Sequence, residues 1–576
     1  MLTKKTVADV IVETLKEVGI KRYYCVPGDS MNEVTTRLDD AGIQFIHTRN
    51  EGAAIFAAGA EAQLTGEITV CAGSAGPGSL HLVNGVHEAS RMNAPMLVFA
   101  THIPSTEIGG KYFQESDLKS IFKDSTCFCE MILNAEQMPR LLNIAIQTAI
   151  AKKGVAVLIF SGDVIQQVAP HQMQKQYIPK YFNPVITPSE TELNSIAKLL
   201  NDSKKIALFC GYGCKEAHDQ VVKLADKLKS PVIHALRGKE FVEYDNPYDV
   251  GMTGFLGAPS GYLAIKECDT LLLLGTGFPY RQFYPEHAKI IQIDIDGENI
   301  GRRVGVDIGA VGDIKPTIEL LLPKLQEKTE RDFLDAALKH YKKSRQNFDK
   351  LATFSTGDTT IHPQYLAKMI DNLANDDTVF SVGTGTPTAW AARYLTMNGK
   401  RRITGSFNNG SIGTAVSQAI GAQSTYPERQ VVAMCGDGGL AMFLGEFITV
   451  ENFNLPIKII IFNNHSYGFV QLEMMEAGTY SHNTDLKNPN FAKVAEAIGI
   501  KGIFINKPED IESGLKEAFA HDGPVVVDVQ VSSHELIMPP KVEIDQVKGF
   551  ALYASRVILD GDFKTLIDVA KENLFR

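Results

Sequence analysis

The sequence predicts an α/β fold of three doubly wound parallel-sheet domains followed by an amphipathic helical tail. Short apolar runs alternate with helical patterns nearly throughout the chain, which is typical of parallel sheets covered by helices. Several of these runs end in glycine, as Val379–Gly383 does. The chain has 576 residues, enough for three or four domains. Together, the alternation and the length predict a series of α/β units.

The first predicted domain spans residues 1–180. Its first 19 residues carry apolar side chains at helical spacing with charges between them, so we expect a surface helix there and not a signal peptide. The predicted strands of this domain are Tyr23–Gly28, Thr69–Cys71 and Val155–Phe160. A proline-rich polar stretch from 170 to 188 follows and indicates a linker.

The second predicted domain spans residues 183–335, the third spans 336–530, and the tail covers 531–576. The strands expected in the second are Ile206–Cys210, Leu271–Leu274 and Ile290–Ile295, and those expected in the third are Val379–Gly383, Val431–Cys435 and Ile457–Phe462. The first and third domains have similar patterns, each opening with a helix and a glycine-ended strand. A duplicated α/β unit and a chance match of common patterns both explain this similarity.

The amino-acid composition indicates a globular protein and argues against nucleic-acid binding. The net charge is −10, with 44% hydrophobic and 22% charged residues, which is typical of a soluble globular protein. An acidic chain lacks the basic footprint of a nucleic-acid-binding protein. The eight cysteines show no paired spacing of a zinc site, so reduced thiols in the cytoplasm are expected. No apolar run approaches the length of a membrane span.

The most specific motif lies in the third domain. Gly436–Gly439 follows one apolar strand, and Asn463 and Asn464 end the next. Because neighbouring parallel strands end at the same edge of a sheet, Asp437 and Asn464 are expected to reach one ion. Such oxygen ligands suit Mg²⁺, and glycines at a strand end allow close approach of a phosphate. The alternative is a plain strand–turn–helix with a capping aspartate.

A single carboxylate marks the first domain. Glu51 begins a run of small and apolar residues, 52–60, that has helical character. A carboxyl group in such surroundings loses water, which disfavours its charged form and favours proton sharing. The alternative is a glutamate that only stabilises the first turn of its helix.

The two strand-end motifs resemble those of thiamine-diphosphate enzymes, in which GDG precedes a pair of asparagines. The resemblance implies that Mg²⁺ is bound by the side chains of Asp437 and Asn464 and by the main-chain carbonyl of Ser466. It also implies that Glu51 activates the cofactor and that Ile412 holds the cofactor bent. The cofactor-binding residues that it implies are Glu51, Gly410, Ser411, Ile412, Asp437, Gly438, Gly439, Asn464, His465, Ser466, Tyr467, Gly468, Phe469 and Val470.

The second domain resembles the FAD-binding domain of family members. Its glycines Gly211 and Gly213 follow a strand, although their spacing is too short for a full dinucleotide fingerprint. The segments that carry the resemblance are His234–Glu240, Gly251–Gly254 and Thr276–Arg281. Decarboxylases of the family keep this domain without a flavin. The FAD-binding residues implied are Thr253, Gly254, Phe255, Leu256, Thr276, Gly277, Phe278, Pro279, Tyr280 and Asp294.

Over its whole length the chain resembles the thiamine-diphosphate-dependent pyruvate oxidase family, and most of all the quinone-linked pyruvate dehydrogenases of bacteria. The resemblance implies oxidation of pyruvate to acetate and CO₂, with electrons passing through FAD to ubiquinone or menaquinone. It implies Glu51, Phe113, Gln114, Phe469 and Glu473 as catalytic residues. One departure is Gly383, where relatives often carry aspartate, which puts in doubt any polar contact expected from that position.

Alternatives from the same family are a phosphate- and O₂-dependent pyruvate oxidase that makes acetyl phosphate, and an acetolactate synthase. The tail favours the quinone-linked activity, because its apolar residues Phe563, Leu566, Ile567, Ala570 and Leu574 fall on one helical face that suits a bilayer surface. A helix packed on the enzyme itself is the alternative. We therefore expect a cytoplasmic protein, peripheral on the inner face of the cell membrane.

Two further expectations concern assembly and class. Family members build the site between subunits, so at least a dimer is expected, and the resemblance suggests a homotetramer. From another class, the chain could be an inactive, lipid-associated binding protein. The presence of Glu51, Asp437 and Asn464 argues against this alternative.

Overall fold

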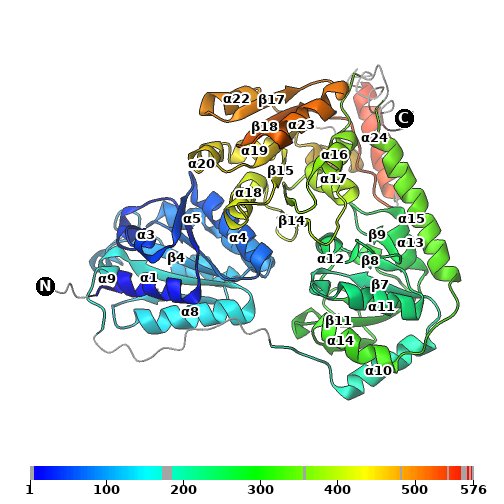
Figure 1. The fold of residues 1–576 in the computed structure, drawn as a ribbon, viewed down its shortest axis with the longest axis horizontal. Coiled ribbons are helices and arrows are strands. Elements are labelled where there is room, and N and C mark those ends of the chain that lie inside the picture. The colour runs from blue at the N-terminus through cyan, green and yellow to red at the C-terminus, as the bar shows by residue number, and fades with distance from the viewer. Residues whose placement is uncertain are drawn as a thin grey trace.

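The computed structural model describes residues 5–170, 184–354, 359–479, 483–540 and 544–559, together with Ile567, Val569 and Asn573. Three six-stranded sheets, each covered by helices, form three α/β domains (Figure 1). All pairs of the named strands are parallel. The predicted fold class of three parallel-sheet α/β domains is therefore confirmed.

The first domain contains the sheet β2-β1-β3-β4-β6-β5. Its strands are β1 (Arg22–Cys25), β2 (Gln44–His47), β3 (Thr69–Gly73), β4 (Met96–His102), β5 (Phe128–Ile132) and β6 (Val155–Ser161). The larger helices around it are α1 (Val7–Val18), α4 (Glu51–Thr65), α6 (Val83–Arg91) and α8 (Met138–Lys152). Helix α1 begins with a capping box at Thr6 and ends at Gly19, whose φ of 93° favours glycine. The central strands β3, β4 and β6 are buried throughout, as expected where helices cover both faces.

The second domain contains the sheet β12-β11-β10-β7-β8-β9. Its strands are β7 (Ile206–Cys210), β8 (Val232–His234), β9 (Asp249–Met252), β10 (Thr270–Leu274), β11 (Lys289–Asp294) and β12 (Ile308–Val311). Its helices include α10 (Glu190–Asp202), α11 (His218–Leu228), α12 (Lys239–Val242), α13 (Pro259–Glu267) and α14 (Ile314–Leu321). The long helix α15 (Asp332–Leu351) then leads to the third domain.

The third domain contains the sheet β14-β13-β15-β16-β18-β17. Its strands are β13 (Val379–Val382), β14 (Arg402–Gly405), β15 (Val431–Gly436), β16 (Lys458–Asn463), β17 (Lys501–Ile505) and β18 (Val525–Gln530). Its main helices are α16 (Pro363–Leu373), α17 (Thr386–Tyr394), α18 (Thr414–Thr425), α19 (Asp437–Met442), α20 (Glu446–Asn452), α21 (Gly468–Glu476), α22 (Phe491–Ile498) and α23 (Ile511–Ala520). The first and third sheets have the same strand order, which favours a duplicated unit over a chance match of patterns.

Helices α4 and α18 join the first domain to the third (Figure 1). Both are rich in alanine and glycine, and almost all of their residues are buried. A Cβ atom on Gly421 would lie 2.0 Å from the carbonyl oxygen of Ala57, so the two backbones meet where only glycine fits. The small residues that looked like an ordinary helix in the sequence therefore form the contact between domains.

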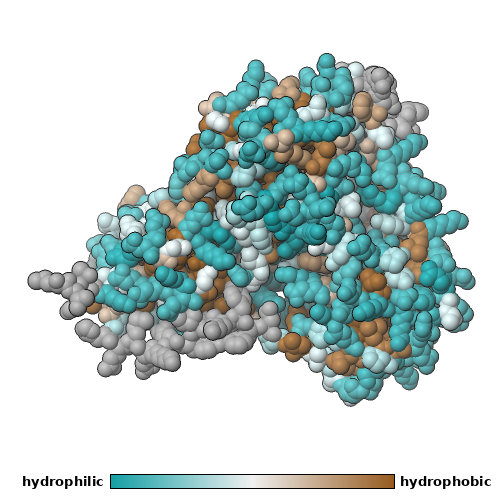
Figure 2. Space-filling view, in the orientation of Figure 1, coloured by the Kyte–Doolittle hydropathy of each residue, from teal (hydrophilic) through white to brown (hydrophobic). Residues whose placement is uncertain are grey.

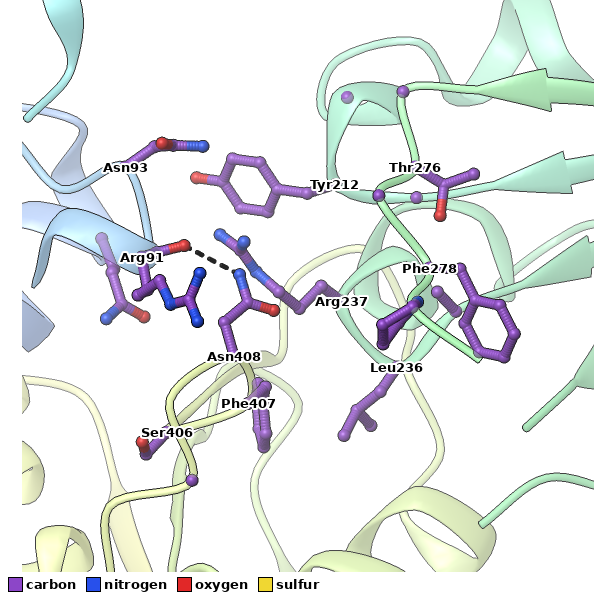
Figure 3. A pocket seen from close by; sticks show the side chains of 18 of the residues that line it. Arg91, Asn93, Tyr212, Leu236, Arg237, Thr276, Phe278, Ser406, Phe407 and Asn408 are labelled. Atoms are coloured by element: carbon purple, nitrogen blue, oxygen red, sulfur yellow. Dashed lines mark hydrogen bonds between the residues drawn. The ribbon is translucent and has the colours of Figure 1, made fainter. Parts of the chain in front are cut away.

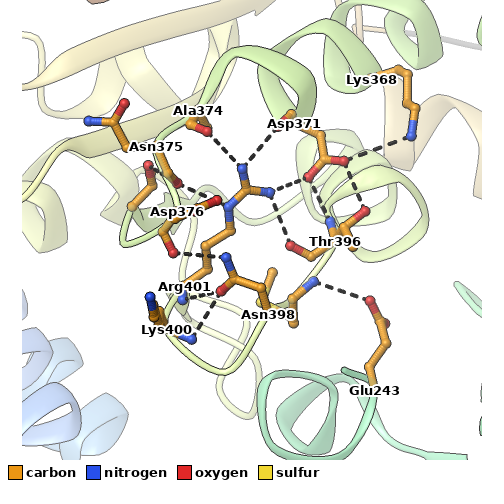
Figure 4. A network of polar contacts seen from close by, with 12 residues as sticks. Glu243, Lys368, Asp371, Ala374, Asn375, Asp376, Thr396, Asn398, Lys400 and Arg401 are labelled. Atoms are coloured by element: carbon orange, nitrogen blue, oxygen red, sulfur yellow. Dashed lines mark hydrogen bonds and ion pairs between the residues drawn. The ribbon is translucent and has the colours of Figure 1, made fainter. Parts of the chain in front are cut away.

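Arg401 is the centre of a polar network of the third domain that lies beside its contact with the second domain (Figure 4). Its buried guanidinium donates to Asp371 Oδ1 at 2.8 Å and to the carbonyl of Ala374 at 2.7 Å. Next to it, Arg402 Nε donates to Glu240 Oε2 of helix α12 at 2.8 Å. Glu243, which follows α12, accepts the Met397 N–H at 3.3 Å. These bonds fix the second domain against the loop that precedes β14.

Helix α24 (Ile544–Leu559) lies in the predicted tail and packs against α21. Tyr553 and Val557 are buried against Met475, and Arg556 donates to the Gly478 carbonyl at 2.7 Å. The predicted apolar face beyond Asp560 lies outside the described residues, except for Ile567, which is half exposed.

The face drawn in Figure 2 is mainly hydrophilic, with apolar residues in small groups. Among the helices that the structure describes, none is both long enough and apolar enough to cross a membrane.

Candidate active site

Strand register brings the two motifs of the third domain together. Strands β15 and β16 pair in parallel, with Gly436 beside Phe462. Asp437, directly after β15, therefore lies next to the asparagines that end β16. Asp437 is only 1% exposed, and burial raises the pKa of its carboxyl group. Because burial penalises a lone carboxylate, a cation at this position would stabilise its charged form.

Close packing at this corner explains the glycines of the motif. A Cβ atom on Gly438 would lie 2.5 Å from the Tyr467 ring, and one on Gly439 would lie 3.3 Å from Ile412 Cγ2. Ile412 is 39% exposed although it is apolar. Its side chain thus stands beside the glycine turn, where the resemblance places the residue that bends the cofactor.

The segment after Asn464 is held by the loop that contains residues 484–486. Tyr467 donates its N–H to the Thr484 carbonyl at 2.9 Å, and Leu486 donates to the His465 carbonyl at 2.7 Å. Asn464 Oδ1 accepts the Ser466 N–H at 3.2 Å. Asp437, Asn464 and Ser466, which carry oxygen donors, thus lie at one corner of a single cavity. This donor set fits Mg²⁺ together with a diphosphate.

Position 383 lies beside this corner. Gly383 accepts the Thr388 hydroxyl through its carbonyl at 2.8 Å, and Thr384 donates its hydroxyl to the Ser411 carbonyl at 2.8 Å. The neighbouring threonines therefore supply the local hydrogen bonds, and the departure at Gly383 leaves Asp437 and Asn464 in place.

Glu51 begins α4 and faces the glycine loop of its own domain. Its side chain is buried, with Oε2 2.9 Å from His81 Nδ1. A Cβ atom on Gly78 would lie 2.9 Å from Glu51 Oε1. Gln114 lies near the same loop, because a Cβ on Gly76 would meet its Cβ at 2.7 Å. Phe113, at 77% exposed, projects from this region.

A cavity of about 1970 Å³ is lined by all three domains. Figure 3 shows Arg91 of the first domain, Tyr212, Arg237 and Thr276 of the second, and Asn408 of the third around it. The predicted site residues that line it are Thr253, Gly254, Phe255, Leu256, Thr276, Gly277, Phe278, Pro279, Tyr280, Asp294, Gly410, Ile412, Asp437, Gly438, Gly439, Asn464, Ser466, Tyr467, Gly468, Phe469, Val470 and Glu473. All of the residues predicted for the second domain and most of those predicted for the third thus share one cavity.

Five predicted residues do not line this cavity: Glu51, Phe113, Gln114, Ser411 and His465. Ser411 is buried, and its hydroxyl donates to Asn84 Oδ1 of the first domain at 3.0 Å. His465 is exposed and is hydrogen-bonded through Nε2 to Gln530 Oε1 at 2.6 Å. The other three belong to the first domain. The predicted site residues of one chain therefore form two groups, one in the first domain and one around the cavity, which we call half-sites.

The part of the cavity in the second domain has features that suit a dinucleotide. The backbones of Gly211 and Gly275 meet, since a Cβ on Gly211 would lie 2.4 Å from the Gly275 carbonyl oxygen. Asp294 ends β11 and is buried, which raises the pKa of its carboxyl group. The rings of Phe255 and Tyr280 stack edge to face, 4.7 Å apart, and both are partly exposed where they line the cavity. Strand-end glycines, an acidic strand end and exposed aromatic rings fit FAD.

Sequence reasoning missed the residues that close this cavity between domains. Arg237 lies 4.2 Å above the Tyr212 ring and donates to the Met92 carbonyl of the first domain at 3.1 Å. Burial lowers the pKa of its guanidinium group. Arg91 offers its carbonyl to the Asn408 side chain at 2.8 Å. Arg237 lies within the His234–Glu240 segment noted above, which was the available signal, whereas nothing in the sequence marked Arg91.

Comparisons with known proteins agree with this architecture. Three segments match the thiamine pyrophosphate enzyme family: residues 5–121 match its N-terminal TPP binding domain, 193–321 its central domain, and 383–529 its C-terminal TPP binding domain. The chain therefore belongs to the thiamine pyrophosphate enzymes.

Individual relatives share most of their length with the chain. YdaP of Bacillus subtilis (strain 168), named as a thiamine pyrophosphate-containing protein, is 37% identical over 96% of both chains. An uncharacterized 42.6 kDa protein of Pseudomonas amyloderamosa is 52% identical over 60% of this chain and 87% of its own. A pyruvate oxidase of Lactiplantibacillus plantarum is 26% identical over 94% of this chain and 91% of its own. Acetolactate synthases match at 27% to 29% identity.

Proposed function

We propose that this enzyme converts pyruvate and water to acetate and CO₂ and passes two electrons through FAD to a membrane quinone, ubiquinone or menaquinone. The observation that carries the proposal is the single cavity that extends from Asp437 and Asn464 to Thr276 and Tyr280. This cavity would hold thiamine diphosphate at one end and a flavin at the other, and the flavin would supply the acceptor for the electrons. The likeness to a pyruvate oxidase supports pyruvate as the substrate.

The residues of the third domain would hold the first cofactor. Asp437, Asn464 and the Ser466 carbonyl would bind Mg²⁺, while Ile412 would press against the bound thiamine diphosphate. When bound, thiamine diphosphate supplies a carbon nucleophile that takes up the electrons left as CO₂ departs, and FAD supplies a two-electron acceptor. The protein contributes orientation and charge at this corner.

Two carboxylates, Glu51 and Glu473, would transfer protons, and a second copy of the chain would complete the site. Glu51 would hold a proton against the aminopyrimidine ring of the cofactor. Because Glu51 lies outside the cavity that Asp437 lines in its own chain, the half-site of one subunit would complete that of another, in a homotetramer. Glu473 is exposed on the cavity wall, where its carboxyl group would manage protons of the substrate.

The proposed membrane acceptor depends on the tail. Helix α24 packs on α21, and α21 also carries Phe469, Val470 and Glu473 of the cavity wall. A change at the cavity therefore has a direct structural route to the tail. The enzyme would work at the inner face of the cell membrane, bound through the apolar residues of its tail.

The test is anaerobic addition of pyruvate to the full chain loaded with thiamine diphosphate, Mg²⁺ and FAD. We expect bleaching of the flavin, acetate as the product, and reoxidation by a quinone in lipid vesicles. Acetyl phosphate formed only with phosphate and O₂ would identify the oxidase alternative. Acetolactate formed without bleaching would identify the synthase, and no product at all would favour an inactive binding protein.

A further inference from the structure

A largely buried network of hydrogen bonds extends from Asp437, at the end of β15, to Asp528 on β18. Asn488 Nδ2 donates to Asp437 Oδ2 at 2.6 Å and to Asn463 Oδ1 at 3.0 Å. Asn463 Nδ2 in turn donates to Asp528 Oδ1 at 2.9 Å. An amide nitrogen has two N–H donors, so these two bonds use both donors of Asn488.

Asp528 anchors the far end of this network. It is fully buried on β18, where Oδ2 accepts the Phe491 N–H at 2.9 Å and Oδ1 also accepts Gln530 Nε2 at 3.0 Å. A carboxylate only accepts hydrogen bonds. Asp528 therefore requires the nitrogen of Asn463 to face it, which turns the oxygen of Asn463 toward Asn488.

The direction of each bond follows from this anchor. Because Asn463 presents its oxygen to Asn488, Asn488 must present its nitrogen, and that nitrogen reaches Asp437. The carboxylates of Asp437 and Asp528 thus lie at the two ends of the network and accept hydrogen bonds, and the amides of Asn488 and Asn463 lie between them. In each of the three bonds an amide nitrogen donates to an oxygen. One oxygen of Asp437, Oδ2, is held by Asn488, which leaves Oδ1 for a cation.

The surroundings of Asn488 fix its position. Thr484 and Leu486, earlier in its loop, are bonded to the backbone of Tyr467 and His465. This ties the loop to the segment that contains Asn464 and Ser466. The loop that carries Asn488 is thus attached to the same corner that would hold the metal.

We infer that Asn488 is a positioning residue that holds the Asp437 carboxylate in a one-oxygen orientation and thereby favours Mg²⁺ over the larger Ca²⁺. Magnesium requires a rigid octahedral set of single oxygens, whereas calcium accepts bidentate carboxylates and variable geometry. Without Asn488, the Asp437 carboxyl group is held by the backbone N–H groups at the start of α19, and it can then turn more easily and offer both oxygens. The inference rests on the metal site of the proposed function and adds the residue that governs its selectivity.

The experiment compares N488A with N490A in the full chain. Asn490 receives the same substitution two residues later, where it caps α22 through the Lys493 N–H at 2.9 Å and leaves Asp437 untouched. Metal-free protein with saturating thiamine diphosphate is titrated with Mg²⁺ and separately with Ca²⁺, and retained thiamine diphosphate is measured after gel filtration. Unfolding of the metal-free proteins provides the control for folding.

For N488A we expect about a 10-fold loss of Mg²⁺ affinity, the lower range for residues that support a metal ligand, with a smaller loss for Ca²⁺. N490A should keep the wild-type preference. The variant D528N should also weaken Mg²⁺ binding, because its amide no longer fixes the orientation of Asn463. Wild-type Mg²⁺ and Ca²⁺ affinities in N488A would overturn the inference alone, whereas wild-type protein that binds neither metal nor thiamine diphosphate would overturn the proposed function.

Discussion

Glu51 is the catalytic candidate whose side chain is enclosed by its own domain. We expect E51Q to fold and to bind both cofactors, because glutamine keeps the size of the side chain and a polar contact to His81. Loss of proton sharing should lower turnover about 10²- to 10⁴-fold, the usual worth of such a group. Steady-state turnover of pyruvate measures this, with E136Q as a control at an exposed position of the same domain away from the cavity. Turnover within a factor of two of wild type would remove Glu51 from the catalytic set.

Asp249 leads to a second prediction at the scale of residues, which concerns how the free energy of unfolding depends on pH. Its Oδ1 lies 3.6 Å from His234 Nε2, and burial raises the pKa of Asp249 to about 8, from 3.8. The same burial lowers the pKa of His234 to about 4, so the pair is neutral near pH 7. Lys239, Glu243 and Tyr341 surround the pair.

The sign of the pH effect follows from the proton on Asp249. Between pH 3.8 and about pH 8 the folded protein binds this proton and the unfolded chain does not, so Asp249 costs stability as pH rises through this window. The variant D249N has no carboxyl group to titrate at this position, so its free energy of unfolding should not fall in this way. Relative to wild type, D249N should therefore become more stable as pH rises from about 5 to 8. Denaturant unfolding at several pH values measures it, with D219N on an exposed helix position as a control. Parallel curves for wild type and D249N would contradict the assignment.

At the scale of elements, the contact between α4 and α18 depends on one glycine. A Cβ on Gly421 would lie 2.0 Å from the Ala57 carbonyl oxygen, which is backbone and cannot turn aside. We expect G421A to force the two helices apart and to lower the free energy of unfolding by about 1–3 kcal/mol, the usual cost of overpacking. Chemical denaturation measures this. Because alanine favours helices, an increase in stability would show that the two helices separate without cost.

The sequence predicted several of the uniformly buried strands, although it missed the central strand β4 (Met96–His102). The strand expected at Ile206–Cys210 matches β7, and the one expected at Val431–Cys435 is β15 less one residue. Edge strands such as β5 (Phe128–Ile132) and β17 were missed, because their half-exposed residues form no continuous apolar run. Asp437 and Asn464 were predicted to be neighbours because neighbouring parallel strands end at the same edge of a sheet.

Other features depend on packing between distant segments and left no trace in the sequence. Asn488 meets Asp437 only through a loop that pairs with residues 465–467. The separation of Glu51 from the cavity follows from how the domains pack. Local patterns encode strands and turns, but not these contacts.

The last prediction at the scale of elements concerns binding of the tail to lipid. Its apolar residues Phe563, Leu566, Ile567, Ala570 and Leu574 would bury enough area for several kcal/mol at about 25 cal/mol per Å², before the entropy of ordering is subtracted. A chain ending at Leu559 keeps the contact of α24 with α21 and should show normal flavin reduction by pyruvate. It should lose pyruvate-stimulated binding to lipid vesicles, measured by co-sedimentation with and without pyruvate. Equal pelleting of both forms would make the tail an ordinary structural helix.

At the scale of the whole molecule, each chain carries two half-sites on different domains. Glu51, Gln114 and the Gly76–Gly78 loop gather in the first domain, and Asp437 with Asn464 lines the central cavity. If each half-site is completed by a second copy, an assembly of two different inactive chains contains one intact site. If the site is completed within one chain, such an assembly contains none.

This difference makes co-expression of E51Q and D437A decisive. Each variant alone should be nearly inactive, D437A through loss of a Mg²⁺ ligand. In a mixed dimer, the D437A chain supplies Glu51 and the E51Q chain supplies Asp437, so one of its two sites is intact. Random pairing makes half of the dimers mixed, so the mixture should recover about a quarter of wild-type turnover, from symmetric association alone. Purification of differently tagged chains through both tags in turn removes the assemblies of one chain type, so turnover per site should rise to about half of wild type in a dimer and to about 0.3 of wild type in a tetramer of two dimers. Turnover of the purified mixed assembly no higher than that of the single variants would mean that each chain builds its own site, and that the cavity closes around Glu51 by a domain movement within one subunit.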